Sequence, residues 1–305
     1  MSVKKYREWR PATRIRKNKS IVEKAPDRLA VLERIKELEL LGRFDVDAEN
    51  DPPTIELLPN MVDYLNEKPL SKIKTKVAYI AAKCFLWYIL KTKKMIIKDI
   101  KGIENFNALK SGAIITCNHF NPFDCFAIEK LLRLSEQKGK KHLFKVIREG
   151  NYTNFPGFYG FLFKNCETLP LSSNKKTMSK FMKAVNRILT RGDLVLIYPE
   201  QSMWWNYEKP KPLKNGAFKF AVKANVPVLP IFITLEDSNI MGSDGFYVKE
   251  YTINISEPIY PKADLNAKEN MEYIRDENFR VWKEIYEDFY KKPLSYTTVI
   301  DSNLS

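Results

Sequence analysis

From residue 95 onward, short apolar runs alternate with amphipathic segments, and this alternation constrains the fold more than any other feature of the sequence. Runs typical of buried strands are expected at 95–100, 112–117, 143–147, 193–198, 227–234 and 247–255. Helical spacing of apolar residues is expected at 122–137, 175–191, 214–224 and 268–291. Strands that alternate with helices predict an α/β domain with a mixed, largely parallel sheet flanked by helices.

The chain outside this region divides into segments of different composition. Residues 1–66 are expected to hold a basic arm, a short helix with Asp27 and Gly42 at its ends, and an acidic, proline-containing linker. Residues 67–94 are expected to form an amphipathic helix, and 95–260 the α/β domain. A C-terminal helix and tail are expected over 261–305.

The segment 71–94 carries an apolar stripe at helical spacing. Its members are Ile73, Val77, Ile80, Cys84 and Trp87. Crossing a bilayer takes about 20 apolar residues, and this run is shorter, interrupted by a lysine and crowded by lysines at both ends. Two interpretations follow: a helix lying in the lipid interface, with its lysines reaching outward, or an amphipathic helix packed on the core.

The formal net charge is +14, with a pI near 9.4, and residues 1–25 are especially basic. Such a charge suits nucleic acid, an anionic membrane surface or an acidic ligand. The sequence has no recognition motif of a nucleic-acid binder, so nucleic acid is not an expected partner. No apolar run follows the basic start, and the four cysteines form no CxxC pair. These features predict a cytoplasmic protein with reduced thiols and no signal peptide.

One of only two histidines in the chain lies in the stretch "AIITCNHFNPFDCFAIEKLL", residues 113–132. Asn121 is a good helix cap and Pro122 a favoured first helical residue, which places Asp124 in the first turn of a helix. His119 then lies in the turn after a strand, and the bend of the chain lets it meet Asp124. The carboxyl ends of strands are where α/β sheets hold their active sites. The alternative is an ordinary capping arrangement with His119 as a polar loop residue.

A histidine held by a carboxylate has a defined chemistry. A neutral imidazole fixed in one tautomer takes a proton from a hydroxyl near pH 7. The arrangement predicted for His119 and Asp124 is a Ser-His-Asp triad without the serine, so that the alcohol of a substrate would be the nucleophile. Two histidines 23 residues apart, without an HExxH motif, make a poor metal-ligand set, and no metal is expected.

The stretch "NHFNPFD" resembles the NHxxxxD signature of the glycerolipid acyltransferase family, typified by the 1-acylglycerol-3-phosphate acyltransferases. Four further blocks resemble the family in the same order: "IKGIENF" (100–106), "FPGFYGFLF" (155–163), "LVLIYPEQS" (194–202) and "LKNGAFKFAVKANVPVLPIFI" (213–233). The resemblance covers about 100–235, and its order along the chain makes it specific.

The resemblance implies a glycerol-3-phosphate acyltransferase-like fold and an O-acyltransferase of phospholipid biosynthesis. A fatty acyl group would pass from acyl-CoA or acyl-ACP, as co-substrate rather than cofactor, to the hydroxyl of a lysoglycerolipid, in the first place 1-acylglycerol-3-phosphate. His119 would be the general base and Asp124 would orient it, while Glu200 matches the motif glutamate. Membrane lipids and the acyl carrier would be the partners, with the protein peripheral or monotopic on the cytoplasmic side of a membrane.

The acceptor is where this chain departs from the family. Gly-Thr-Arg-Ser follows the motif glutamate in the family, whereas Gln201, Ser202, Met203 and Trp204 stand here, so the arginine expected to meet the acceptor phosphate is absent. The remaining residues expected to bind substrate are Asn118, Asn121, Gln201, Ser202, Lys214 and Gly216, together with Glu200. Candidate replacements for the arginine are Arg148, Lys209, Lys211 and Lys214. A different lysolipid or glycolipid acceptor, or a non-catalytic protein of the membrane surface, therefore stays open.

Overall fold

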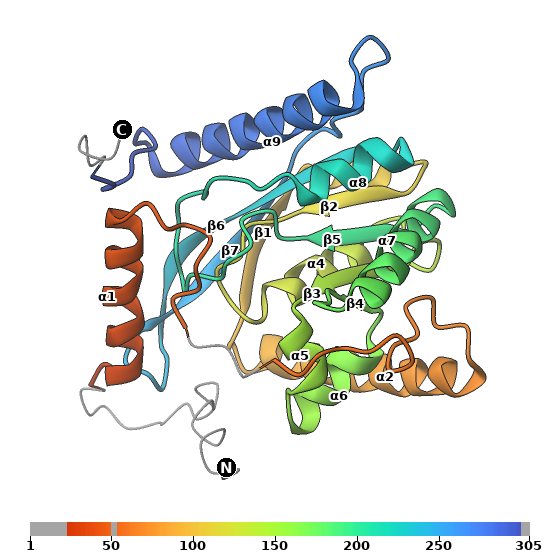
Figure 1. The fold of residues 1–305 in the computed structure, drawn as a ribbon. Helices are drawn as coiled ribbons and strands as arrows, with labels where there is room; N and C mark the ends of the chain where they lie inside the picture. Colours follow the sequence, from red (N-terminus) through yellow and green to blue (C-terminus); the bar gives the residue numbers. More distant parts are fainter. Residues whose placement is uncertain (1–22, 50–53, 300–305) are drawn as a thin grey trace.

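The computed structural model describes residues 23–49 and 54–299, and its centre is a seven-stranded sheet (Figure 1). The strands lie in the order β1-β7-β6-β2-β5-β3-β4. Their bounds are β1 Ile96–Lys101, β2 Ala113–Thr116, β3 Leu143–Ile147, β4 Thr168–Pro170, β5 Leu194–Ile197, β6 Val228–Met241 and β7 Tyr247–Ile255. All neighbouring strands are parallel except β6 and β7, which form an antiparallel hairpin. The predicted mixed, largely parallel α/β sheet is confirmed.

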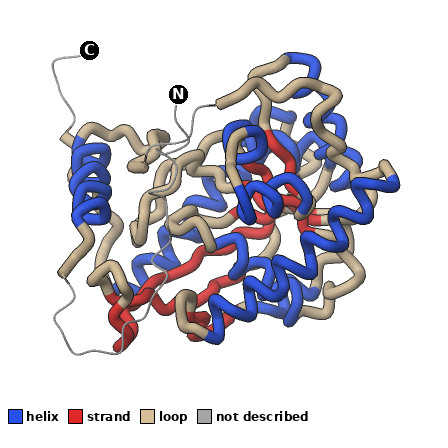
Figure 2. Tube along the Cα trace, turned by 90° about the horizontal axis from the view of Figure 1, so that it is seen from below, coloured by secondary structure: helices blue, strands red, loops and turns tan. Residues whose placement is uncertain are grey.

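Helices cover both faces of this sheet. The described helices are α1 Pro26–Leu40, α2 Pro69–Lys91, α3 Ile103–Asn107, α4 Asp124–Leu134, α5 Glu149–Thr153, α6 Gly157–Asn165, α7 Lys175–Thr190, α8 Gly216–Ala224 and α9 Ala267–Tyr290. Side chains of α7 and α8, with Ile274 of α9, pack in one core, and those of α2 and α4 in another. Figure 2 shows the strands running through the interior between the helices.

The central strands explain why the apolar runs in the sequence are continuous. All four residues of β2 and all four of β5 are buried. Ile115 and Leu196 face the core beneath α4, whereas Ile114 and Val195 face the core beneath α7 and α8. A strand buried on both faces has no polar side to alternate with its apolar side.

The short elements and some boundaries differ from the sequence expectation. The helices α3, α5 and α6 and the strand β4 were not expected from the sequence. α4 begins at Asp124 rather than at 122, since Asn121 Oδ1 accepts the Phe123 N–H (3.0 Å) and forms a turn ahead of the helix. α1 begins at Pro26 after Ala25, so Asp27 lies inside the first turn and is not the cap.

The apolar stripe of the amphipathic helix faces outward. α2 buries a second row, Ala78, Ala82, Leu86 and Ile89, against the rest of the protein. On the opposite side Ile80 and Trp87 are each 65% exposed, and Ile73, Val77 and Cys84 are exposed with them. The stripe recognised in the sequence is therefore not the face that packs on the core. No helix among residues 23–49 and 54–299 is long and apolar enough to cross a membrane.

Two segments expected in the N-terminal region lie against the α/β domain. Residues 43–49, which belong partly to the expected acidic linker, cover the loop after β5: Phe44 stacks on Trp204 with ring centroids 5.6 Å apart. Further along, Leu57 is fully buried and its N–H donates to Glu149 (2.7 Å) at the start of α5. The expected basic arm lies, apart from residues 23–25, outside the described residues. The division into domains stays a prediction.

Candidate active site

The structure brings His119 and Asp124 together at the carboxyl end of β2. His119 Nδ1 lies 2.7 Å from Asp124 Oδ2. Asp124 is the first residue of α4 and only 1% exposed, whereas 26% of the His119 side chain is exposed. An ionised carboxylate only accepts hydrogen bonds, so Nδ1 carries the hydrogen and Nε2 keeps its lone pair. That nitrogen can take a proton from a substrate.

The chain itself fixes the carboxylate that faces His119. Asp124 Oδ2 also accepts the backbone N–H groups of Phe120 (3.2 Å) and Asn121 (3.3 Å). Several donors on one buried oxygen hold the charge in place without a metal or a lysine. The aspartate therefore shapes the turn and orients the imidazole at the same time.

A residue that the sequence analysis missed completes this arrangement. Tyr198, directly after β5, donates its O–H to Asp124 Oδ1 (2.6 Å). Its ring stacks on the His119 imidazole, with centroids 4.0 Å apart and an angle of 18° between the planes. Burial raises the pKa of the Tyr198 phenol well above its ordinary value, and the Asp124 carboxylate raises that pKa further. The phenol thus stays a neutral donor. The only sequence signal was an aromatic residue ahead of the Pro-Glu pair.

Glu200 lies beneath the corner rather than at an open acceptor surface. Its side chain is 1% exposed, and its Oε2 accepts the His119 N–H (3.1 Å). Oε1 accepts the Lys211 N–H (2.9 Å), and the Lys211 ammonium lies 3.3 Å from Oε2. The carboxylate therefore positions the backbone that carries His119. This place differs from the acceptor-site role that the resemblance implied.

The two asparagines of the motif brace the same turn. Asn118 is buried and pairs with the backbone of Ile233 in β6, accepting its N–H (2.8 Å) and donating to its carbonyl (3.0 Å). Asn121 makes the turn ahead of α4 described above. The position of Asn118 was not expected, since it was predicted to bind substrate, whereas Asn121 was predicted both to bind substrate and to cap the helix.

Ser202 and the lysines near it also form hydrogen bonds within the protein. Ser202 is 1% exposed, donates to the Phe44 carbonyl (2.6 Å) and accepts from Lys211 Nζ (2.7 Å). Lys211 itself is buried, and Lys209 donates to Glu39 (2.6 Å) in α1. These contacts set Lys209 and Lys211 apart from the cations that could meet an acceptor phosphate.

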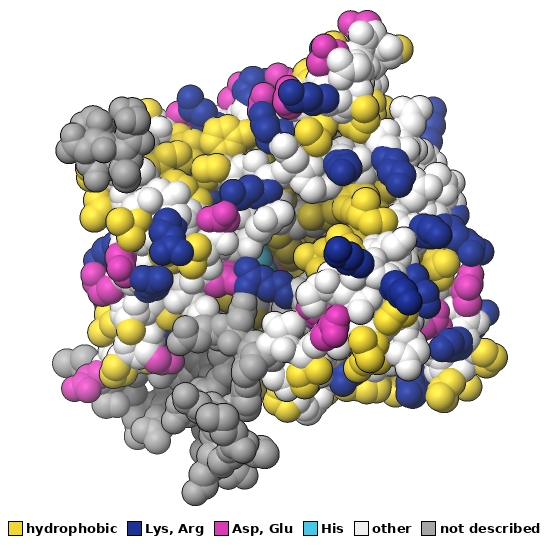
Figure 3. Space-filling model, in the orientation of Figure 1, with side chains coloured by type: hydrophobic (Ala, Val, Ile, Leu, Met, Phe, Trp, Pro, Cys, Tyr) yellow, Lys and Arg dark blue, Asp and Glu magenta, His cyan; other side chains and the backbone are white. Residues whose placement is uncertain are grey.

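Lys214 and Gly216 lie close to the loop after β5, which contains Gln201. Gln201 adopts a left-handed backbone with φ of 62°. Its Nε2 would be 3.9 Å from a Cβ built on Gly216, the first residue of α8. Lys214 lies just ahead of α8 and its N–H donates to the Pro199 carbonyl (2.8 Å). Arg148, which follows β3, donates to the Gln201 carbonyl (2.9 Å). Figure 3 shows a histidine in a hollow of this face, with acidic and basic side chains at its rim.

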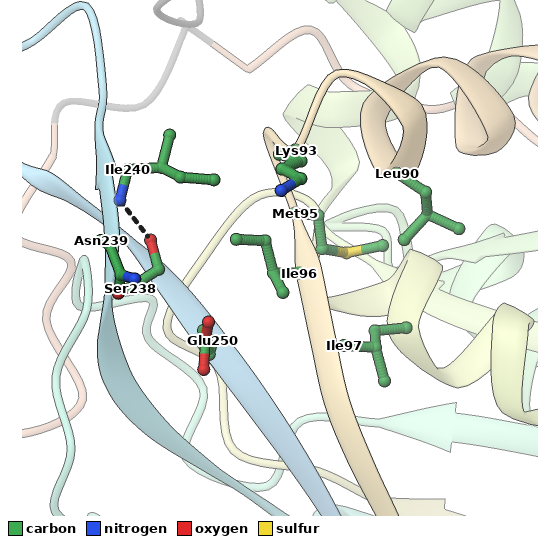
Figure 4. Close-up of a pocket in the computed structure, with 9 residues that line it drawn as sticks. All are labelled: Leu90, Lys93, Met95, Ile96, Ile97, Ser238, Asn239, Ile240 and Glu250. Carbon is green, nitrogen blue, oxygen red and sulfur yellow. Dashed lines mark hydrogen bonds between the residues drawn. The ribbon is translucent and has the colours of Figure 1, made fainter.

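A separate cavity of about 340 Å³ lies away from these residues, between the end of α2 and the sheet (Figure 4). Leu90, Met95, Ile96 and Ile97 line one side of it, and Ser238 to Ile240 with Glu250 line the other. It contains none of the residues of the His119 corner.

Comparison with known proteins relates this corner to a family. The family model described as Acyltransferase matches residues 98–234, which run from β1 into β6 and include His119, Asp124 and Glu200. This part of the chain is similar to the acyltransferase family. The matched segment contains all of the residues that surround His119 in the candidate site: Asn118, Asn121, Asp124, Tyr198 and Glu200.

Two curated proteins similar to this chain are both named as 1-acyl-sn-glycerol-3-phosphate acyltransferases. The chloroplastic 1-acyl-sn-glycerol-3-phosphate acyltransferase BAT2 of Brassica napus is 26% identical over 189 residues, 60% of this chain and 52% of the relative. The 1-acyl-sn-glycerol-3-phosphate acyltransferase of Saccharomyces cerevisiae is 23% identical over 211 residues, 68% of this chain and 66% of the relative. The chain thus spans about half to two thirds of the length of these relatives.

One similar solved structure is the 1-acyl-sn-glycerophosphate (LPA) acyltransferase PlsC of Thermotoga maritima. It has 19% sequence identity and a TM-score of 0.45, and the match covers 74% of this chain and 81% of that one.

Proposed function

We propose that this protein is an O-acyltransferase that moves a fatty acyl group from a thioester to the hydroxyl of a lysoglycerolipid. The observation that carries the proposal is the 2.7 Å contact between His119 Nδ1 and the buried Asp124, which leaves the partly exposed imidazole with a lone pair on Nε2. The names of the curated relatives support 1-acylglycerol-3-phosphate as the first acceptor to test. The donor is acyl-CoA or acyl-ACP, with no further cofactor.

The reaction follows from the geometry of the corner. The acceptor hydroxyl gives its proton to His119 Nε2 as its oxygen attacks the thioester carbonyl. Asp124 stabilises the imidazolium that forms, and Tyr198 keeps the carboxylate in place. When the tetrahedral intermediate collapses, the carbon–sulfur bond breaks and the thiolate takes the proton from His119. The products are the acylated lipid and the free thiol of the carrier.

Lipid substrates require access to a membrane, and α2 supports such access. Its exposed row of Ile73, Val77, Ile80 and Trp87 is the apolar face of an interfacial helix, with lysines at both ends to meet anionic head groups. The same helix buries Leu86 and Ile89 in the core that also contains α4. We therefore propose that α2 holds the protein peripherally on the cytoplasmic surface of a membrane, close to its lipid acceptor.

The test is acyl transfer by the purified protein. Wild type, supplied with acyl-CoA or acyl-ACP and 1-acylglycerol-3-phosphate in vesicles, should form the diacyl product detected by mass spectrometry. His119→Ala should lower turnover at least about 10²-fold, the lower bound of a positioned base, without a change in thermal unfolding. His142→Ala is the matched control, because this second histidine is exposed, pairs through its ring nitrogen with Glu167 (2.8 Å) and lies outside the His119 corner.

Two outcomes would contradict the proposal. Near wild-type turnover by His119→Ala would show that the corner is only a structural turn. Binding to vesicles without transfer to any lysolipid, tested with lysophosphatidylcholine and monoacylglycerol as further acceptors, would favour the non-catalytic membrane-surface protein.

A further inference from the structure

Two cations near the candidate active site form ion pairs with aspartates that lie far away in the sequence. The Arg148 guanidinium pairs with Asp47, and Lys214 Nζ lies 3.0 Å from Asp45. Both aspartates belong to residues 43–49, which we call the strap. Arg148 and Lys214 are two of the four cations that could replace the missing family arginine, and the other two, Lys209 and Lys211, are turned to Glu39 and Ser202.

The sheet places Arg148 at the same edge as His119, and the Lys214 N–H donates to the Pro199 carbonyl (2.8 Å) in the loop after β5. His119 follows β2, the loop with Gln201 follows β5, and Arg148 follows β3, in the strand order β2-β5-β3. These strands are parallel, so all three carboxyl ends meet at one edge, with β2 and β3 about 10 Å apart at two strand spacings. A glycerol phosphate whose hydroxyl lies at His119 would direct its phosphate toward this rim.

The strap is held in this position by the loop that replaces the family's Gly-Thr-Arg-Ser. Ser202 Oγ donates to the Phe44 carbonyl (2.6 Å), and Trp204 Nε1 donates to the Val46 carbonyl (2.7 Å). The Met203 N–H donates to Asp47 Oδ1 (2.6 Å). These hydrogen bonds hold the strap, and with it Asp45 and Asp47, beside Arg148 and Lys214.

We propose that Asp45 and Asp47 determine acceptor specificity, because they neutralise the two cations that an acceptor phosphate would otherwise bind. A phosphate monoester must displace these carboxylates or lie against their negative charge, whereas an uncharged head group meets neither cost. The strap therefore shifts the preference of the site away from phosphate-bearing acceptors and toward acceptors without a phosphate monoester. This inference rests on the proposed acyl transfer at His119.

The experiment compares two acceptors in one assay. For wild type and Asp45→Asn/Asp47→Asn, kcat/KM is measured with 1-acylglycerol-3-phosphate and with 1-monoacylglycerol. The ratio of the two values should rise about 3- to 10-fold in the variant, the range expected for removing charges from partly exposed ion pairs. Asparagine at 47 can still accept the Met203 N–H, so the strap keeps this anchor. Glu49→Gln removes one charge from the same strap, but from a pair with Arg28 (2.9 Å), and should leave the ratio unchanged.

A second comparison tests whether the effect passes through the proposed cation. In an Arg148→Ala background, Asp47→Asn should no longer raise the ratio. A ratio unchanged by the double asparagine variant, or an equal rise in the Arg148→Ala background, would overturn the inference.

Binding of glycerol 3-phosphate, measured by calorimetry, makes the same comparison without turnover. The double asparagine variant should bind this anion about 3- to 10-fold more tightly than wild type. Equal affinities of the variant and the wild type for glycerol 3-phosphate would overturn the inference, even if neither lipid were acylated. The absence of acylation would separately refute the proposed acyl transfer.

Discussion

At the scale of single residues, His119 is held by neighbours that come from two places in the chain, the first turn of α4 and residues 198–204 after β5. Asp124 holds Nδ1, Glu200 holds the backbone N–H, and Tyr198 covers one face of the ring. The Trp204 N–H also donates to the His119 carbonyl (3.2 Å), which ties the turn to the loop after β5. A side chain fixed at its ring and at its backbone has little freedom to leave the productive orientation.

Tyr198→Phe tests this arrangement at one atom. Phenylalanine keeps the stacked ring but removes the 2.6 Å hydrogen bond to Asp124. We expect kcat to fall about tenfold with little change in KM, because the carboxylate loses a donor that orients it for the imidazole. Steady-state kinetics measure kcat and KM separately. A raised KM with an unchanged kcat would instead place Tyr198 in acceptor binding.

At the scale of elements, α2 carries two apolar rows that face opposite directions. The row around Ala82 and Leu86 packs inward, while the row around Ile80 and Trp87 meets solvent. An exposed apolar row of this kind is typical of an interaction surface. The helix therefore joins the domain core to the surface on which we expect lipid.

Ile80→Asp/Trp87→Asp should separate membrane binding from folding. Both side chains are largely exposed, so we expect an unchanged unfolding temperature. Binding to anionic vesicles in a sedimentation assay should weaken at least about tenfold, because each buried apolar side chain contributes about 1.5–3 kcal/mol. Tyr260→Asp, at a similarly exposed apolar site after β7, is the control and should bind as wild type. Equal binding by the double variant would rule out α2 as the membrane contact.

At the scale of the whole molecule, one carboxylate joins three segments that are far apart in the sequence. Glu39 of α1 accepts from Lys209 Nζ (2.6 Å), from the Tyr207 hydroxyl (2.8 Å) and from the Thr297 N–H (2.9 Å). Burial alone would raise its pKa, but these hydrogen bonds and the Lys209 charge outweigh burial and hold the pKa below its ordinary value. The N-terminal helix, the loop after β5 and the C-terminal segment are therefore fastened together by an ionised group.

This linkage predicts a pH dependence of stability. A carboxylate whose pKa is lower in the folded state stabilises the fold fully above its ordinary pKa of 4.5, and the contribution is lost as the pH falls through the folded value. Glu39→Gln should therefore unfold about 2–6 °C below wild type at pH 7, and the gap should close toward pH 3.5. Thermal unfolding followed by circular dichroism measures it. A gap that stays constant with pH would show that the charge of Glu39 does not stabilise the fold.

The sequence by itself determined the central strands and the long helices. β2 and β5 are recognisable because strands buried on both faces must be apolar throughout, and α7 and α9 because long helices repeat their pattern several times. The sequence also indicated that His119 and Asp124 meet, because a turn of five residues leaves few arrangements for them. Local patterns of this kind depend on residues that are neighbours along the chain.

Only the tertiary structure decided which groups surround that pair. Tyr198, the partner of Asp124 that follows β5, lies 74 residues away in the sequence, and the stripe of α2 points outward because a different row fits the core. Asn118 and Glu200 are buried because the parallel strands bring their backbone partners within reach, whereas Ser202 is buried beneath residues 43–49, where it donates to the Phe44 carbonyl. Asp47 pairs with Arg148 and Asp45 pairs with Lys214, although about 100 residues or more separate the partners in the sequence. Such contacts depend on how the strands order themselves in the sheet, and no local pattern in the sequence encodes that order.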